Sequence, residues 1–280
     1  MLVPITQSGT KPPFFLVHGL NGLLLHTAAM ARALGPDRAF YAIFARGLDG
    51  RQQPCESVRE MAVDYLQEIR GVQPTGPYYI GGQCPGGLVA LEIARELSAL
   101  GQQVGTVLLL NPPPLLPFGG DRYQMIDLHP QVFQQLYDNA QTMLRKSVAR
   151  IDNVPFNTRD PKQMHMAAAA VVRSTIAFSR HRPAPYSGAT DIILSTAQAP
   201  AHFQPELPWQ QILTGPQRVH VLPGNHLEFF SLQLGEICRL MRFILDGALA
   251  SETYASGAND KNVAHVTRHK DESFHDQGVV

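Results

Sequence analysis

Three side chains in the sequence have the chemistry and the context of a nucleophilic site, and the first is Cys84. It is the centre of Gly82-Gln-Cys-Pro-Gly86, which lies between a predicted strand and a predicted helix. This is the context of a nucleophile elbow, in which a strained turn lifts the reactive side chain off the sheet edge. A helix that begins at about Pro85 would point its positive end at the sulfur and favour the thiolate. The alternative is that Cys84 is a small buried apolar side chain beside a glycine-rich turn.

The second candidate is His226, in Pro223-Gly-Asn-His-Leu-Glu228, directly after the last predicted strand. A histidine at this place late in the chain can act as the base of a nucleophile elbow. The alternative is a generic loop histidine. His18 also ends a predicted strand, but its neighbours Gly19-Leu20 suit an oxyanion-binding loop better than a base. His220 alternates into a strand, which predicts a packing role.

The third candidate is Asn111, in Leu110-Asn-Pro-Pro-Pro-Leu115, where it could orient His226. An amide here would harm a Ser–His pair, because an acid is needed to stabilise the imidazolium, but Cys-His-Asn sets do exist. Cysteine and asparagine are therefore mutually compatible. The alternative is that Asn111 only turns the chain before three prolines. Asp191 begins a strand, at its wrong end, and Glu206 is the reserve candidate for the orienting residue.

Alternating strands and helices must position these residues. Unbroken apolar runs predict strands buried on both faces, and apolar residues three to four positions apart predict helices. The alternation predicts an α/β fold with a mostly parallel sheet, helices on both faces, and chemistry at the carboxyl ends of the strands. The predicted strands cover residues 14–17, 39–44, 78–80, 104–110, 191–194 and 219–222, and the predicted helices cover 56–71 and 86–100.

The alternation stops between residues 112 and 185, where no strand is predicted. Two helical patterns occupy residues 130–148 and 161–181, the second with Asp160 as its N-cap and Pro161 in its first turn. An insertion of this size just after a strand end is typical of a lid over an active site. The alternative is a pair of additional core helices with no role in substrate access.

Composition excludes several classes of protein. The 280 residues include 23 basic and 23 acidic side chains, so the chain lacks the charge expected of a general nucleic-acid or anionic-membrane binder. No apolar run approaches the roughly 18 residues of a membrane helix, and no secretory signal is visible. Three cysteines argue against a disulfide framework or a zinc site, and Cys55 and Cys238 read as structural. We expect a soluble cytoplasmic protein with one domain over residues 1–248 and a disordered tail over 249–280.

Several motifs taken together resemble the thioesterase domains of modular polyketide and nonribosomal peptide synthetases, which are members of the α/β-hydrolase superfamily. The resemblance spans about residues 12–248. Together these motifs are specific, whereas a Gly-x-x-x-Gly pattern alone would not be. They are Phe15-Leu-Val-His-Gly-Leu-Asn-Gly22, Ala45-Arg-Gly-Leu-Asp-Gly50, Ile69-Arg-Gly-Val-Gln-Pro-Thr-Gly-Pro-Tyr78, the Cys84 elbow with Gly87-Leu-Val-Ala-Leu-Glu92, and Gly224-Asn-His226.

The resemblance implies an α/β-hydrolase fold and an enzyme that releases acyl chains from the phosphopantetheine arm of an acyl or peptidyl carrier protein. It implies a catalytic triad of Cys84, Asn111 and His226, and it makes the backbone N–H of Leu20 an oxyanion donor. The insertion 112–185 would form the lid and the wall of the acyl pocket. No separate cofactor or metal is implied, because the substrate arrives on the phosphopantetheine.

The sequence departs from the family pattern at three positions. Cysteine replaces serine at position 84, and asparagine replaces aspartate at position 111. The second oxyanion donor in this fold is the N–H of the residue after the nucleophile, and Pro85 has none. Unless the N–H of Gly86 or the side chain of Gln83 substitutes, we expect deacylation by water to be slow.

These departures favour an acyltransferase or cyclase in which acyl-Cys84, itself a thioester, passes the chain to a nucleophile. In this scheme His226 moves the proton. The alternatives are a hydrolytic thioesterase that releases a free acid and a non-catalytic, thioesterase-like binding protein. Basic side chains in the insertion could meet an acidic carrier protein or the phosphate, although a solvated helix face is the more usual explanation. They are Arg145, Lys146, Arg150, Arg180 and Arg182.

Overall fold

The structure is a computed structural model that describes residues 2–113, 130–148, 156–197, 208–226, 228–247 and 266–267. Within these residues one sheet contains eight strands. They are β1 (Leu2–Thr6), β2 (Lys11–Val17), β3 (Arg38–Ile43), β4 (Tyr78–Gln83), β5 (Val104–Leu110), β6 (Thr190–Ser195), β7 (Gln217–Leu222) and β8 (Val266–Thr267).

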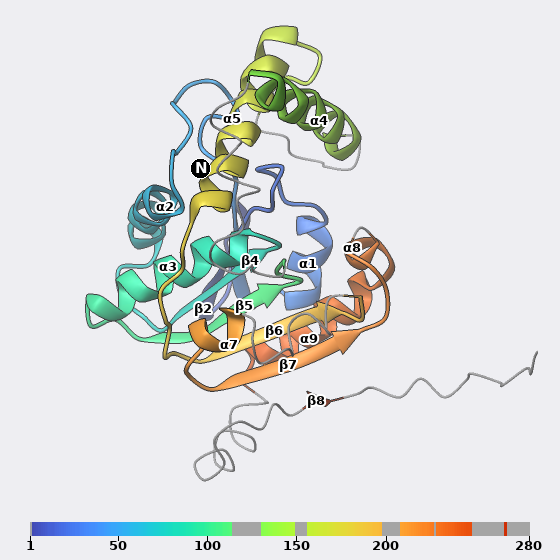
Figure 1. Ribbon diagram of the computed structural model, residues 1–280. Helices are drawn as coiled ribbons and strands as arrows, with labels where there is room; N and C mark the ends of the chain where they lie inside the picture. The colour runs from blue at the N-terminus through green and yellow to red at the C-terminus, as the bar shows by residue number, and fades with distance from the viewer. Residues whose placement is uncertain are drawn as a thin grey trace, which may run out of the picture.

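The strands lie in the order β1-β3-β2-β4-β5-β6-β7-β8 (Figure 1). Only β1 is antiparallel to its neighbour within the described sheet, and every other pair is parallel. This arrangement of strands, together with the helices that cover both faces of the sheet, confirms the predicted α/β-hydrolase fold. Each predicted strand is present, because its apolar residues face helices on both sides of the sheet.

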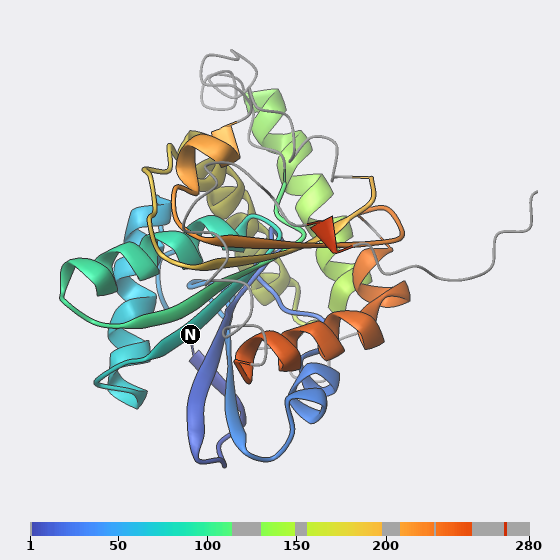
Figure 2. The same cartoon turned by 90° about the horizontal axis from the view of Figure 1, so that it is seen from below.

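Helices cover both faces of the sheet. Figure 2 shows the second and third helices of the chain on one face and the first and last on the other. None of the described helices is both long and apolar enough to span a bilayer. The helices are α1 (Thr27–Leu34), α2 (Val58–Val72), α3 (Gly86–Ala99), α4 (Pro130–Val148), α5 (Pro161–Arg180), α7 (Pro208–Ile212), α8 (Phe229–Leu232) and α9 (Leu234–Leu245).

The pleat of the strands divides the apolar core in two. In β2, Phe14 and Leu16 join a core that contains residues of α1, α5 and α9, whereas Phe15 and Val17 join a core built with α2 and α3. All four side chains are fully buried. The carboxyl end of β2, which leads to the 18–20 loop, is therefore held from both sides.

Two elements near the N-terminus were not predicted. Strand β1 is only partly buried and contains Pro4, which an edge strand tolerates because it need not donate to a ladder on its free side. Helix α1 begins after His26, whose φ is 61° and whose side chain makes no cap hydrogen bond. The short elements α7, α8 and β8 were not predicted either.

The two helices predicted in the insertion are present as α4 and α5. The carboxylate of Asp160 accepts a hydrogen bond of 2.9 Å from the N–H of Lys162, and Pro161 occupies the first turn, which confirms the predicted cap. Residues 114–129 and 149–155 of the insertion lie outside the described residues. So do Glu206 and the predicted tail, apart from Val266–Thr267. The lid function of the insertion stays a prediction.

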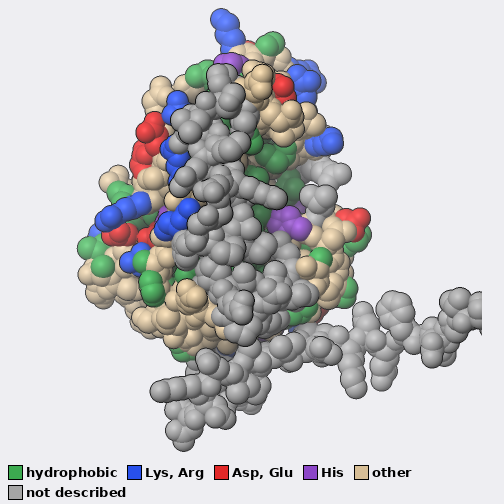
Figure 3. All heavy atoms as spheres, in the orientation of Figure 1, with side chains coloured by type: hydrophobic (Ala, Val, Ile, Leu, Met, Phe, Trp, Pro, Cys, Tyr) green, Lys and Arg blue, Asp and Glu red, His purple; other side chains and the backbone are tan. Residues whose placement is uncertain are grey.

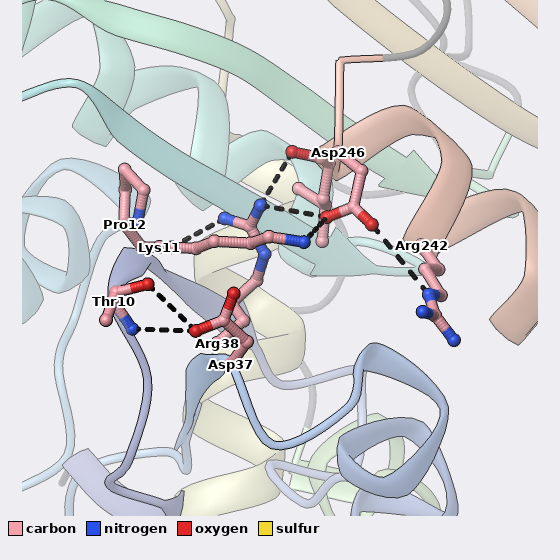
Figure 4. Close-up of polar contacts among 8 residues, drawn as sticks. Thr10, Lys11, Pro12, Asp37, Arg38, Arg242 and Asp246 are labelled. Carbon is pink, nitrogen blue, oxygen red and sulfur yellow. Dashed lines mark hydrogen bonds and ion pairs between the residues drawn. The ribbon is translucent and has the colours of Figure 1, made fainter.

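A buried arginine ties the end of α9 to the sheet (Figure 4). Arg38 is 2% exposed and donates hydrogen bonds to the carbonyl oxygens of Pro12, at 2.5 Å, and Leu245, at 2.7 Å. Asp246 accepts from Arg38 and, at 2.9 Å, from Lys11. The start of β2, the start of β3 and the end of α9 are therefore joined through one guanidinium group.

Candidate active site

The predicted elbow is a tight turn between β4 and α3. Cys84 follows β4 directly, and its φ of 54° lies in the left-handed region. Its N–H donates to the carbonyl of Leu110 at 2.8 Å, and the N–H of Gly87 donates to the carbonyl of Cys84 at 3.2 Å. The turn thus continues the sheet on one side and opens the helix on the other. This confirms the strand–turn–helix context expected of the motif.

Close backbone contacts explain the two motif glycines. A Cβ on Gly86 would lie 2.1 Å from the carbonyl oxygen of His18, and a Cβ on Gly82 would lie 2.2 Å from the carbonyl carbon of Gly86. Both distances are far inside van der Waals contact. The start of α3 is therefore pressed against the end of β2, as only glycine at these positions permits.

Cys84 and His226 lie within contact distance. The sulfur is 3.2 Å from Nε2 of His226, although 142 residues separate the two in the chain. His226 follows β7, and Cys84 follows β4. Because both strands belong to the parallel part of the sheet, their carboxyl ends share one edge, where the predicted chemistry was expected.

Asn111 completes the group at the end of β5. It is fully buried and has a φ of 49°, a conformation that asparagine tolerates better than most residues. Its Nδ2 lies 2.9 Å from Nδ1 of His226, and its Oδ1 accepts a 3.0 Å hydrogen bond from the N–H of Ser195. The structure thus brings together all three residues that the sequence singled out, and their catalytic roles remain predictions.

The pKa shifts of Cys84 and His226 differ in direction from those expected of a thiolate–imidazolium pair. Burial raises the pKa of the Cys84 thiol to about 12, and burial lowers the pKa of His226. Desolvation penalises the charged form of each group, so both shifts favour a neutral thiol beside a neutral imidazole. Burial of the sulfur therefore opposes the thiolate that the start of the helix was expected to favour.

The region predicted to bind the oxyanion lies between the loop after β2 and the elbow. Gly19, next to Leu20, packs against Gln83: a Cβ on Gly19 would be 3.6 Å from the Gln83 carbonyl oxygen and 3.9 Å from its Cγ. Gln83 is 7% exposed, and its buried Oε1 has no hydrogen-bond partner among the described residues. The unpartnered atom of this amide is its accepting oxygen, one residue before the nucleophile, and Pro85 supplies no N–H.

The two other histidines in or directly after predicted strands, His18 and His220, are both buried. His18 is fully buried, with Nδ1 2.8 Å from the Gly19 carbonyl oxygen and Nε2 2.9 Å from the Tyr65 hydroxyl. Burial lowers the pKa of His18 to about 4, so it stays neutral. His220 is buried within β7. These observations fit the packing role predicted for His220 and the exclusion of His18 as a base.

The remaining candidates from the sequence are buried, and Asp191 has another partner. Asp191 is fully buried and accepts two 2.7 Å hydrogen bonds from Arg218. Cys55 and Cys238 are buried free thiols, and burial raises both of their pKa values. Both cysteines therefore have the structural setting that the sequence predicted.

One hydrogen-bond donor of the site, the backbone N–H of Ser195, was not predicted from the sequence. Strand β6 lies between β5 and β7, so its last residue comes next to both Asn111 and the β7 end that leads to His226. A backbone donor cannot be recognised from the type of its side chain. The order of the strands could have indicated this donor, because adjacent strand ends in a parallel sheet lie side by side.

Basic side chains are present on the two insertion helices. Arg145 and Lys146 are exposed in the last turn of α4, and Figure 3 shows Lys and Arg side chains on the part of the surface that α4 and α5 form, at the top. Arg182 donates to the carbonyl oxygens of Ser179 and His181. Arg150 lies outside the described residues.

Comparison with known proteins shows which family the chain matches. The family model described as "Thioesterase domain" matches residues 12–245. Malpibaldin synthetase of Mortierella alpina is 39% identical over 111 residues, which are 40% of this chain and 2% of the relative. A probable non-canonical nonribosomal peptide synthetase, CymA, of Salinispora arenicola is 26% identical over 239 residues, or 81% of this chain and 3% of the relative. The chain therefore spans a very small part of these relatives.

Solved structures support the fold. The crystal structure of the NocB thioesterase domain, in covalent complex with a fluorophosphonate nocardicin G analogue, superimposes with a TM-score of 0.65 at 22% sequence identity. The match covers 88% of this chain and 100% of that domain. At this identity the likeness concerns the arrangement of strands and helices.

Proposed function

Because this chain belongs to the thioesterase domain family, we propose that it takes an acyl chain from the phosphopantetheine thioester of a carrier protein onto Cys84 and transfers it to a nucleophile. The transfer would release or cyclise a chain in nonribosomal peptide or polyketide biosynthesis. The observation that carries the proposal is the 3.2 Å contact between the Cys84 sulfur and Nε2 of His226 at the elbow.

The first step is an exchange between the Cys84 thiol and the pantetheine thioester. The thiol loses its proton to solvent, the thiolate attacks the carbonyl carbon, a new C–S bond forms, and the C=O electron pair moves to oxygen. The N–H of Leu20 is the proposed donor to this oxyanion, with the Gln83 amide or the Gly86 N–H in the place of the missing Pro85 donor. The C=O bond then re-forms, the C–S bond to pantetheine breaks, and pantetheine leaves as a thiolate that takes up a proton from solvent.

This site is better suited to acyl transfer than to hydrolysis. Loss of one oxyanion donor costs about 2.7–4 kcal/mol of transition-state stabilisation in a well-studied hydrolase, or roughly 10²–10³ in rate. Water needs that stabilisation most, because it is a weak nucleophile. An acyl-Cys84 is still a thioester, so it keeps its activation for a stronger nucleophile.

Intact-protein mass spectrometry tests the proposal. Purified protein incubated with an acyl-N-acetylcysteamine thioester should gain one acyl group, and the Cys84→Ala variant should gain none. Tryptic mapping should place the group on residue 84. Normal thioester turnover with no adduct, or an unchanged adduct on the variant, would contradict the scheme.

A second candidate is a thioesterase-like binding protein without turnover. The raised pKa of Cys84 and the absent donor at Pro85 favour it. The same experiment separates the two functions, because a binding protein would form no adduct and release neither pantetheine nor acid. Steady release of free acid without added nucleophile would instead identify a hydrolase.

A further inference from the structure

A directed chain of hydrogen bonds runs into the imidazole of His226. The N–H of Ser195 donates to Oδ1 of Asn111 at 3.0 Å, and Nδ2 of Asn111 lies 2.9 Å from Nδ1 of His226. A backbone N–H can only donate, and an asparagine amide has one accepting end and one donating end. With its oxygen occupied by Ser195, Asn111 presents N–H to the imidazole, so Nδ1 must accept.

The surroundings hold the amide in this orientation. Ser195 and Asn111 are both fully buried, so water cannot replace a lost partner. Turning the amide over would set two N–H groups against each other and leave the Ser195 N–H unpaired, at the cost of its full desolvation. A carboxylate at position 111 would behave differently, because its two oxygens could accept from Ser195 and from His226 together.

We infer that Asn111, fixed by the Ser195 N–H, holds His226 as the tautomer protonated at Nε2, so that the imidazole donates a hydrogen bond to the Cys84 sulfur and does not act as its base. Asn111 is thus a positioning residue that sets the direction of the contact. The inference rests on the proposed function and revises the proton-moving role that the sequence suggested for His226.

This tautomer limits which acceptors can take the acyl chain. Exchange with a thiol needs no base from the protein: a thiolate attacks, the C–S bond to Cys84 breaks, and Cys84 leaves as a thiolate stabilised by the Nε2–H. An unprotonated amine attacks equally well and loses its proton to solvent afterwards. Water must lose a proton as it attacks, and Nδ1, the nitrogen with a lone pair, is held by Asn111. The acceptor class is therefore a thiol or an amine.

Nuclear magnetic resonance tests the tautomer directly. A long-range ¹H–¹⁵N correlation spectrum of the uniformly labelled protein distinguishes protonated from unprotonated ring nitrogens, and loss of one pattern in His226→Gln assigns the residue. We expect Nε2 protonated and Nδ1 unprotonated in the wild type. In Asn111→Asp the two should exchange. A wild-type spectrum with Nδ1 protonated would overturn the inference, whether or not an acyl adduct forms.

Partition of the acyl group tests the consequence. Protein charged with an acyl-N-acetylcysteamine thioester is offered 2-mercaptoethanol or ethanolamine, and acyl product is compared with free acid after subtraction of the Cys84→Ala background. Wild type should give mainly the thioester or the amide. Replacing a triad acid by an amide lowers kcat of a serine protease by about 10⁴ through the wrong tautomer, so Asn111→Asp should raise the hydrolytic rate at least tenfold.

A matched substitution controls for added charge. Asn139→Asp makes the same change at an exposed position of α4 and should alter neither the spectrum of His226 nor the partition. An unchanged partition in Asn111→Asp would refute the assignment of acceptors. Absence of any adduct in the wild type would instead contradict the proposed function, and the spectrum would still decide the tautomer.

Discussion

Nε2 of His226 lies 3.2 Å from the sulfur of Cys84, yet the pKa values of the two groups move apart. Burial raises the pKa of the thiol to about 12 and lowers the pKa of the imidazole. A thiolate–imidazolium pair would need the opposite shifts. Burial of the two groups therefore opposes an ion pair between them, although they are in contact.

The pH dependence of alkylation follows from these shifts. Because the thiol loses its proton only near pH 12, the thiolate fraction should grow about tenfold per pH unit between pH 6 and 10. The rate of Cys84 alkylation by iodoacetamide, followed by mass spectrometry, should rise in the same way without levelling off. Free cysteine, the reference, levels off above its ordinary pKa of about 8.5. A plateau for Cys84 between pH 6 and 8 would show an ion pair instead.

Restoring the missing backbone donor should accelerate deacylation. Pro85 has a φ of −66° and a ψ of −15°, which alanine adopts without strain. Pro85→Ala adds one N–H beside the nucleophile, and we expect hydrolysis of acyl-Cys84 to increase by roughly 10²-fold or more. The decay of the adduct mass with time measures this rate. Pro36→Ala, on an exposed turn, should leave it unchanged, and equal rates in all three proteins would show that Pro85 is not limiting.

The contact between Gly86 and His18 should make the elbow intolerant of a methyl group. Gly86→Ala places a carbon 2.1 Å from a backbone oxygen, and we expect a loss of about 3 kcal/mol in the free energy of unfolding. Gly71→Ala is the matched control, since a Cβ there meets nothing within 4 Å. Gly71 lies in α2, so the control should gain about 0.5–1 kcal/mol. Urea denaturation measures both, and similar values for the two variants would contradict this account.

The buried guanidinium of Arg38 should contribute measurably to stability. Arg38→Met removes the donors to the Pro12 and Leu245 carbonyls and should cost about 2–3 kcal/mol. Arg242→Met removes only an exposed contact of 3.8 Å to Asp246 and should cost less than about 0.5 kcal/mol. Thermal and urea denaturation compare the two variants, and equal costs would mean that the tie seen in Figure 4 is not stabilising.

The sequence predicted the elements that bury their residues most completely. Strands β4 and β5 carry unbroken apolar runs, and the motif glycines mark the turn that follows β4. Because parallel strands end at one edge, the meeting of Cys84, Asn111 and His226 could be anticipated from their positions after strands. Strand β1 was not predicted, because its residues are only partly buried and their apolar pattern is weaker.

The charge states and the direction of the hydrogen bonds could not be predicted in this way. The pKa of Cys84 depends on how much water reaches the sulfur, which is a property of the packed site. The role of Asn111 depends on a donor from Ser195, supplied by the strand that separates β5 from β7. The residue types were visible in the sequence, whereas the proton positions required the three-dimensional neighbours.

The left-handed backbone at Cys84 has a consequence for the evolution of this site. A φ of 54° is unfavourable for any residue with a Cβ and free of steric cost for glycine alone. At position 84 the usual preference for alanine over glycine should therefore be reversed. A more stable backbone at this position would therefore be obtained with glycine, at the cost of the nucleophile.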